Sequence, residues 1–420
     1  MNFIDLFAGA GGLSEGFIRQ GFEPVAHIEM DAYAAQTLKT RAAYYYLKEN
    51  GGLDVYHRYL KNLITRDELY QEVDSKVLKT VLNREISNQS IDEIFQTIDE
   101  SLENKQTSAV DVLIGGPPCQ AYSLVGRARD PYNKEHDPRN YLYQQYVKFL
   151  EKYKPKLFVF ENVPGILTAG KGKLFEDVKR IMDEAGYDIE ARILDASMFG
   201  VLQKRRRVIL IGWVKGTGLF YPDFDNYNHK YLVSDILNDM PALQPGETRD
   251  FIYNAYPSDY LRKHGIRSDD DILVQHISRP HNDHDREIYK LAIEQWDKEK
   301  KRLKYTDIPE KNRTHKNITA FLDRFKVVAR DLSYSHTMVA HIAKDGHYYI
   351  HPDIKQLRSL SVREAARIQS FPDNFFFEGP RTAMFTQIGN AVPPLMAESI
   401  AEKILQILEN RIERQIELSI

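Results

Sequence analysis

The stretch Phe3-Ile-Asp-Leu-Phe-Ala-Gly-Ala-Gly-Gly12 decides the fold class, because an apolar run passes directly into a glycine-rich turn. The residues that follow, 13–20, have the apolar spacing of a helix. Glycines let the backbone approach a ligand closely, and the amino end of a helix offers free N–H groups. Ser14 stands at the third glycine position of the dinucleotide fingerprint G-x-G-x-x-G. The turn therefore indicates a nucleotide-like cofactor and argues against an NAD-dependent oxidoreductase.

Apolar runs alternate with helical patterns along the first half of the chain. We expect strands at 3–7, 25–28, 110–114, 157–160 and 208–213. We expect helices at 13–20, 32–48, 142–152 and 174–185, and a final helix at about 395–416. This alternation predicts an α/β fold with a mostly parallel sheet that is covered on both faces and binds ligands at the carboxyl ends of its strands. Glu29 ends the second run, where an acid suits ribose hydroxyls, although a plain surface acid is the alternative.

The composition is that of a soluble globular protein. The 420 residues predict two or three domains, and 57 Lys and Arg against 60 Asp and Glu give a net charge of −3. This near-neutral balance argues against a histone-like protein but not against a local basic face. No apolar run reaches the roughly 18 residues of a membrane helix, and no targeting segment is visible before Phe3. We expect a cytoplasmic protein that contacts no membrane.

A helical insertion is expected at about 50–108. Thr65–Glu68 and Ser90–Glu93 both have the pattern of a helix capping box. Between residues 65 and 104, ten acidic residues oppose four basic ones. The simplest interpretation is an acidic helical surface.

The regular pattern ends after Trp213 and returns at 361–369. Residues 221–351 are rich in Tyr, His, Asn and Pro, and we expect few clean helices there. Between residues 297 and 330, eleven basic residues oppose five acidic ones. This region indicates a second domain with a basic surface.

The only cysteine, Cys119, lies in the motif Gly115-Gly-Pro-Pro-Cys-Gln-Ala-Tyr-Ser123, directly after a predicted strand. A lone cysteine can form neither an intrachain disulfide nor a multi-cysteine zinc site. It is either a buried small hydrophobe or a reactive thiol. Its position at the carboxyl edge of the sheet, and two prolines that restrict the backbone before it, favour a reactive thiol.

Three further motifs place polar groups at turns beside predicted strands. Glu161 ends the apolar strand of Phe158-Val-Phe-Glu-Asn-Val-Pro-Gly165, where it serves either in proton transfer or as a cap of the next turn. Gln203-Lys-Arg-Arg-Arg207 precedes the last predicted strand, and its guanidinium groups suit phosphates, carboxylates or base carbonyls, although a solvated charged face is the alternative. Gln387-Ile-Gly-Asn-Ala-Val-Pro-Pro394 is a second glycine–proline turn that opens the last helix.

These motifs, in this order, closely resemble the DNA cytosine-5-methyltransferase family. The resemblance runs from residue 3 to about 401 and includes Ile28-Glu-Met-Asp31 and Ser361-Val-Arg-Glu-Ala-Ala-Arg-Ile-Gln-Ser-Phe-Pro372. It implies a Rossmann-like domain that binds S-adenosylmethionine. In the glycine-rich turn, the matching cofactor positions are Phe7, Ala8, Gly9, Gly11 and Gly12.

The resemblance also assigns the other cofactor positions. Glu29 matches the acid that holds the ribose hydroxyls, and Met30 matches the residue packed on the adenine. Asn390 and Val392 match residues that close over the methionine part and the target base. The family usually has an aromatic residue where Met30 stands. It also has an Asp-Ile pair after the third strand that contacts the adenine amino group, but the insertion obscures this pair and we assign no residue to it.

The remaining matches surround a flipped cytosine. Cys119 matches the nucleophile. The groups that hold the base are matched by Glu161, Arg205 and Arg207. The residues beside the nucleophile, which lead into a loop that closes over DNA and extends to about residue 139, are Pro118, Gln120 and Ser123.

The chemistry explains why these residue types are needed. Carbon 5 of cytosine is a poor nucleophile, but addition of a thiolate to carbon 6 makes it enamine-like, so that it can attack the sulfonium methyl. Glu161 can supply or share a proton at ring nitrogen 3, and Arg207 can bind the exocyclic carbonyl while Arg205 orients the site. Loss of the carbon 5 proton then expels Cys119. The base must leave the stacked duplex for this to happen.

The resemblance implies a catalytic domain at 1–215 and 381–420 and a smaller, irregular target recognition domain at 216–380. The basic stretch at 297–330 is expected to contact DNA phosphates. Three histidines that precede this stretch in the sequence are expected to lie at the surface or to contact phosphates rather than to bind a metal: His276, His281 and His284. The DNA sequence that is recognised cannot be read from the chain.

We therefore expect a monomeric, metal-free DNA cytosine-5-methyltransferase of the prokaryotic type, acting on double-stranded DNA and paired with a cognate restriction endonuclease. One alternative is a related enzyme that modifies transfer RNA, against which the long recognition segment argues. Another is a catalytically silent DNA-binding relative, against which the intact Cys119, Glu161 and Arg207 argue. An adenine-specific methyltransferase would need an Asn/Asp-Pro-Pro-aromatic block, and none is evident at a strand end.

Overall fold

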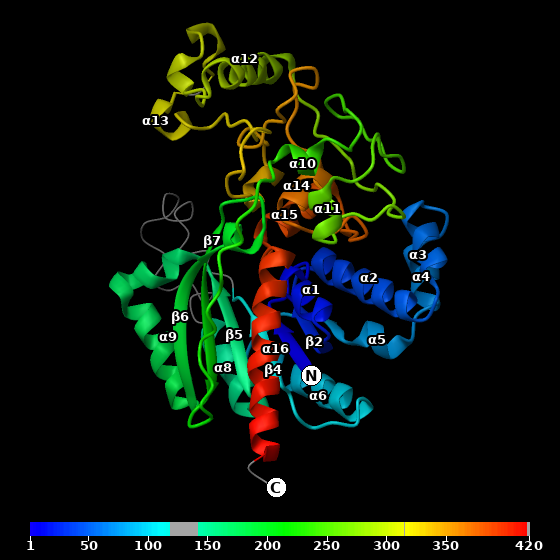
Figure 1. Cartoon of the computed structure of the whole chain (residues 1–420), viewed down its shortest axis with the longest axis vertical. Coiled ribbons are helices and arrows are strands. Elements are labelled where there is room, and N and C mark those ends of the chain that lie inside the picture. Colours follow the sequence, from blue (N-terminus) through cyan, green and yellow to red (C-terminus); the bar gives the residue numbers. More distant parts are fainter. Residues whose placement is uncertain (118–141, 315, 418–420) are drawn as a thin grey trace.

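The structure, a computed structural model, describes residues 1–117, 142–314 and 316–417. Within these ranges seven strands form one sheet in the order β3-β2-β1-β4-β5-β7-β6 (Figure 1). Only β7 runs against the others, so the predicted mostly parallel sheet is confirmed. The strands are β1 Asn2–Leu6, β2 Glu23–Glu29, β3 Val81–Asn83, β4 Val112–Gly115, β5 Leu157–Asn162, β6 Tyr187–Asp195 and β7 Arg206–Val214.

The two faces of the sheet bury alternate residues of each strand. On β4, for example, Val112 and Ile114 pack into one core and Leu113 into the other. The first face is covered by α1 (Gly12–Arg19) and α16 (Pro394–Glu417), which pack against each other. The second face is covered by α6 (Ile91–Asn104), α8 (Leu142–Tyr153) and α9 (Lys173–Glu184). The predicted coverage of both faces is thus confirmed.

The predicted insertion is helical and extends the sheet. Its elements follow α2 (Ala32–Glu49) and lie on the right of Figure 1: α3 Leu53–Leu60, α4 Arg66–Gln71 and α5 Ser75–Lys79. The capping box at Thr65 is confirmed, since its side chain and that of Glu68 bond to each other's backbone N–H. The box predicted at Ser90 is wrong, because the backbone of Ser90 is already helical (φ −103°, ψ −13°) and its hydroxyl accepts from the Ser87 N–H instead.

Several elements were not predicted from the sequence, and three of them are notable. β3 is only three residues long, and β6 alternates charged and apolar residues at the other edge of the sheet. The third is α12 (Asp283–Glu299), a 17-residue helix in a region expected to hold few helices. Asn282 caps it, and it buries Ile288, Tyr289, Ala292 and Ile293 along one side.

The upper part of Figure 1 contains residues from about 225 to 390, with α12 and α13 farthest from the sheet and α14 and α15 next to it. Its other helices are α10 Ser234–Leu237, α11 Asp259–Lys263, α13 Ile318–Phe321, α14 Val362–Ile368 and α15 Arg381–Asn390. Buried residues of this part join the core on the α1 face, among them Leu237, Tyr260 and Phe385. The division into domains at 216 and 380 stays a prediction.

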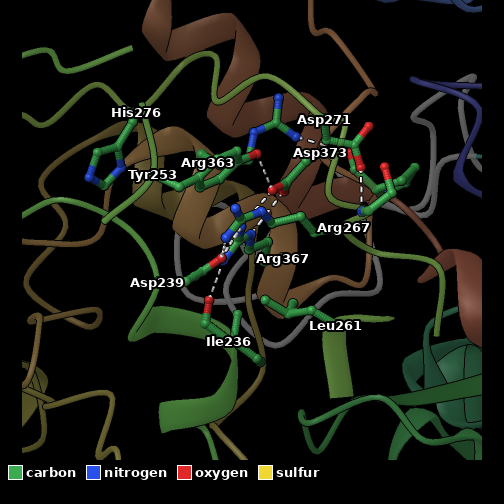
Figure 2. A network of polar contacts seen from close by, with 12 residues as sticks. Ile236, Asp239, Tyr253, Leu261, Arg267, Asp271, His276, Arg363, Arg367 and Asp373 are labelled. Carbon is green, nitrogen blue, oxygen red and sulfur yellow. Dashed lines mark hydrogen bonds and ion pairs between the residues drawn. The ribbon is translucent and has the colours of Figure 1, made fainter. Parts of the chain in front are cut away.

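A buried ionic network connects loops of this upper part to α14. Figure 2 shows Arg367 between Asp239 and Asp373, with ion pairs of 2.5 Å to each. Arg267 also bonds to Asp239, and its guanidinium stacks 3.3 Å from the ring centre of Tyr253. The Tyr253 hydroxyl donates to Asp373 at 2.6 Å. Buried ion pairs therefore contribute to holding this region to α14.

None of the helices in the described ranges combines the length and apolar character needed to cross a membrane.

Candidate active site

The glycine-rich turn and Glu29 meet where β1 and β2 end side by side. The Ala8 N–H donates to the Ile28 carbonyl at 3.1 Å. The Glu29 carboxylate accepts from the Gly9 N–H and the Asp31 N–H, both at 2.7 Å, one on each oxygen. Burial raises the pKa of Glu29, while these two N–H groups act in the opposite direction. Each oxygen keeps a further lone pair with which to accept a ligand hydroxyl.

The glycines of this turn are required for two different reasons. Gly9 has a φ of +55°, and no atom lies within 4 Å of the place where a Cβ would stand, so this part of the turn borders open space. A Cβ on Gly12, in contrast, would collide with the Val392 carbonyl oxygen. The turn that carries Val392 thus lies directly against the glycine-rich turn, and the cofactor role of Val392 stays a prediction.

Two side chains complete this end of the sheet. Met30 is 63 % exposed, which is unusual for a large apolar residue and leaves its thioether free to cover a planar ligand. Asn83, the last residue of β3, donates its amide to the Glu29 and Met30 carbonyls at 2.9 and 3.0 Å. Sequence analysis missed Asn83, because a strand of three residues inside an insertion leaves no periodic signal.

The predicted carboxylate and arginine of the base pocket form an ion pair. Glu161 on β5 and Arg207 on the neighbouring β7 approach to 2.6 Å, between Oε1 and Nε, and both are nearly buried. A Cβ on Gly116 would stand 2.6 Å from Oε2 of Glu161, so glycine is needed there to admit the carboxylate. The Asn162 amide donates to the Pro117 carbonyl at 3.2 Å. The pair therefore lies beside the segment that leads to Cys119.

Arg205 lies elsewhere, in the interior. It is fully buried, and its guanidinium donates to three main-chain carbonyls: Met338, Gly389 at 3.1 Å and Ala391 at 2.8 Å. These contacts place it beneath the turn that carries Asn390 and Val392. Asn390 itself is exposed at the end of α15. Arg205 thus holds the main chain of this turn through hydrogen bonds. Its predicted role in orienting the site stays a prediction.

Four predicted site residues lie outside the described residues: Pro118, Cys119, Gln120 and Ser123. The loop that was expected to extend to about residue 139 lies outside them too.

The three histidines singled out from the sequence are not grouped as metal ligands in the part of the chain that the structure describes. Across 1–117, 142–314 and 316–417, no group of three or more His, Cys, Asp or Glu side chains is arranged to hold a metal ion. The prediction that His276 lies at the surface or contacts phosphate is wrong, because it is fully buried and bonds to the Ser361 hydroxyl at 2.9 Å and the Pro241 carbonyl at 2.8 Å. The same prediction is wrong for His281, whose side chain is only 1 % exposed and whose ring contacts the Ser359 hydroxyl at 3.0 Å.

Comparison with protein families identifies the chain. The family of C-5 cytosine-specific DNA methylases matches residues 1–54 and 69–406. The chain belongs to this family. It is a DNA-methylating enzyme, and DNA is its substrate. The interruption in the match, at 55–68, falls in the insertion.

Relatives of this methylase match over nearly their whole length. The type II methyltransferase M.Bpa9945I of Bacillus paralicheniformis is 44 % identical, over 97 % of this chain and 99 % of the relative. M.DdeI of Desulfomicrobium norvegicum is 31 % identical, over 98 % and 90 %. A prophage-encoded E. coli protein assigned as a DNA modification methyltransferase has a similar solved structure, with a TM-score of 0.63, 22 % identity and coverage of 97 % and 99 %. S. pombe Dnmt2 methyltransferase shares the fold at a TM-score of 0.51 and 14 % identity.

Proposed function

We propose that this methylase transfers a methyl group from S-adenosylmethionine to carbon 5 of a cytosine within a specific double-stranded DNA sequence. The base is flipped out of the duplex and bound transiently to Cys119. The observation that carries the proposal is the Glu161–Arg207 ion pair at the carboxyl edge of the sheet, beside the segment that leads to Cys119. A carboxyl and a guanidinium side by side match the ring nitrogen and the carbonyl of one edge of cytosine.

The turn between β1 and α1 fits S-adenosylmethionine. Glu29 can hold the ribose hydroxyls with its free lone pairs, the exposed Met30 can cover the adenine, and the open space beside Gly9 admits the ligand close to the backbone. When bound, the cofactor supplies an electrophilic sulfonium methyl group. Phe7, Ala8 and Gly11 shape the same turn, and the turn of Asn390 and Val392 closes it from the side of Gly12.

We assign to Asn83 the place at which the family has an acid after the third strand. Its amide nitrogen already bonds to the Glu29 and Met30 carbonyls, so its side-chain oxygen stands at the same end of the site. An amide oxygen can accept a hydrogen bond from the adenine amino group as a carboxylate does. A neutral acceptor gives a weaker bond than a charged one.

The base pocket performs the chemistry with side chains of this chain. The Cys119 thiolate adds to carbon 6, a covalent bond forms, and electron density moves toward carbon 5 and ring nitrogen 3. Glu161 supplies or shares a proton at that nitrogen, and Arg207, held by Glu161, binds the exocyclic carbonyl. After methyl transfer, loss of the proton from carbon 5 restores the double bond and expels the thiolate. Pro118, Gln120 and Ser123, which are close to Cys119 in the sequence, belong to the same proposed site.

The segment 216–380 is the proposed reader of the DNA sequence, with the basic stretch 297–330 on the phosphates. The names of the relatives support a further step, that this methylase is the modification partner of a type II restriction endonuclease. Cytoplasmic location and a monomeric state are part of the same proposal.

Bisulfite sequencing of DNA from cells that express the protein tests the proposal directly. We expect cytosines protected at one recurring sequence and nowhere else. Unmethylated DNA throughout, with folded enzyme present, would favour a silent DNA-binding protein or an RNA-modifying enzyme instead.

A further inference from the structure

Two buried glutamines lie in contact between the cofactor-facing turn and the upper part of the molecule. Gln203 precedes β7, and Gln369 follows α14; both are completely buried. The Gln203 amide donates to the side-chain oxygen of Gln369 at 2.8 Å. The mechanism described above uses neither residue.

Gln203 is attached to the proposed DNA-reading segment. Its side-chain oxygen accepts from the Met338 N–H at 2.6 Å, and its backbone pairs with Ser335. Its amide also donates to the Ile368 carbonyl at 3.1 Å. Arg205, two residues further along the chain, donates to the Met338 carbonyl. The N–H and the carbonyl of Met338 are therefore both hydrogen-bonded, one by Gln203 and the other by Arg205.

Gln369 is attached to the cofactor-facing turn. Its amide donates to the Ile388 carbonyl at 2.6 Å and to the Ala391 carbonyl at 3.3 Å. That turn is also in tight contact with the reading segment, because a Cβ on Gly389 would collide with the backbone of Ala340. On its other side, the Val392 carbonyl touches Gly12 of the cofactor turn.

The two side chains form a short, rigid connection. Each amide uses two donor hydrogens and one acceptor, a set that neither glutamate nor methionine can supply. Every contact at either end is to main chain or to the other glutamine, so a shift of Met338 cannot be absorbed by a side-chain rotation in between. Buried networks of this kind are coupled, and losing one partner leaves the rest unsatisfied.

We propose that Gln203 and Gln369 are positioning residues that couple DNA binding by segment 216–380 to cofactor binding at the turn of Asn390 and Val392. This rests on the function proposed above. Target DNA that fixes the segment around Met338 also fixes the turn against Gly12, and the cofactor then binds more tightly. By thermodynamic linkage, the cofactor tightens DNA binding by the same factor.

Gln275 offers a matched control. It is a buried glutamine whose amide donates to the Phe377 carbonyl at 2.6 Å and whose oxygen accepts from the Phe377 N–H at 3.1 Å. It makes equivalent main-chain bonds in the same upper part but none to the cofactor-facing turn. Gln275→Met should therefore cost similar folding stability without changing the coupling.

Isothermal titration with S-adenosylhomocysteine, with and without a duplex that carries the sequence found by bisulfite sequencing, measures the coupling. We expect DNA to tighten cofactor binding in the wild type by roughly 5- to 150-fold, the usual range for such coupling. In Gln369→Met and Gln203→Met the factor should fall to about 2-fold or less, and Gln275→Met should keep it.

Each other outcome is informative. Coupling that persists in Gln369→Met and Gln203→Met, or coupling absent from the wild type, would overturn the inference. So would failure of both variants to fold while Gln275→Met folds, since their role would then be structural. A wild type that binds no S-adenosylhomocysteine and methylates no DNA would contradict the proposed function itself.

Discussion

The sheet and the upper part of the molecule are held together by different forces. In the sheet, aliphatic and aromatic side chains alternate between two cores, and regular backbone pairing satisfies the polar groups. In the upper part, where regular secondary structure is sparser, three arginines with no exposed surface add buried polar contacts to the apolar core; they are Arg358, Arg363 and Arg367. A periodic core tolerates small changes because its neighbours relax, whereas a buried ion network fails when one charge loses its partner.

The largest effect is expected from Arg367→Met. The change leaves Asp239 and Asp373 buried with fewer cationic partners, so we expect a loss of about 3–5 kcal/mol in the free energy of unfolding. Ile211→Val in the sheet is the control and should cost only about 1 kcal/mol. Urea denaturation measures both. Equal costs would contradict the contrast between the two regions.

The sheet also contains a buried acid, Asp5, whose ionisation makes the stability of the fold depend on pH. This dependence gives a second way to compare the sheet with the upper part. Burial raises the pKa of Asp5 to about 8, and its bonded partner is the Ser14 hydroxyl rather than an arginine. A raised folded-state pKa means that ionisation destabilises the fold, with no penalty below pH 4 and the full penalty above pH 8. Asp5→Asn should remove this pH dependence of the free energy of unfolding, whose slope is at most about 1.4 kcal/mol per pH unit. Thermal melts from pH 5 to 8 test it; parallel curves for both proteins would contradict the assignment.

Glu15 should show the opposite pH dependence of stability, which thermal melts extended to lower pH would measure. Burial alone would raise the pKa of Glu15, but the Arg41 guanidinium at 2.6 Å overrides it and holds the pKa at about 2. This stabilisation is complete above pH 4.5 and is lost as the pH falls toward 2.

A smaller effect is expected where the two glycine-rich turns touch. Gly12→Ala would drive a Cβ into the Val392 carbonyl, so we expect about 1–3 kcal/mol of destabilisation together with weaker cofactor binding. Gly9→Ala meets no atom and should cost only the strain of its φ of +55°, about 1 kcal/mol. Calorimetric titration with S-adenosylhomocysteine separates them. Equal affinities for Gly12→Ala and the wild type would rule out the contact as a determinant of the site.

The smallest effect is expected on the outer face of α9. Arg180 forms ion pairs with Asp177 and Glu184, all within one helix and exposed to solvent. Such pairs contribute little, so Arg180→Ala should leave the unfolding midpoint within experimental error. A clear shift would show that surface charge also stabilises the sheet region.

The same contrast explains how far the sequence could be interpreted. Strands such as β4 and β5 are short apolar runs next to turns, and their order predicted both the sheet and the edge at which Glu29 and Glu161 lie. β3 and β6 were missed because edge strands carry weak or mixed periodicity. α12 was missed because its apolar positions lie among many charges.

Candidate site residues, like strands and helices, could be predicted only where a local sequence pattern marks them. Those within contiguous motifs, such as Glu29 and Arg207, could be proposed from the sequence, and the structure places them next to Gly9 and Glu161. The hydrogen bonds of Asn83, Gln203 and Gln369 join segments far apart in the chain, and no local pattern marks such contacts. His276 was expected at the surface or on phosphates, yet two hydrogen bonds allow its burial.

The central claim, that Cys119 is the nucleophile, is tested most directly by methyl transfer from labelled S-adenosylmethionine to the target duplex. Cys119→Ser should fold and bind DNA like the wild type but transfer methyl groups at least about a thousandfold more slowly, because a serine hydroxyl is far less nucleophilic than a thiolate at neutral pH. Since Cys119 is the only cysteine, thiol labelling of the wild type should abolish transfer in the same way. Full methyl transfer by Cys119→Ser, or by the fully labelled enzyme, would contradict the account.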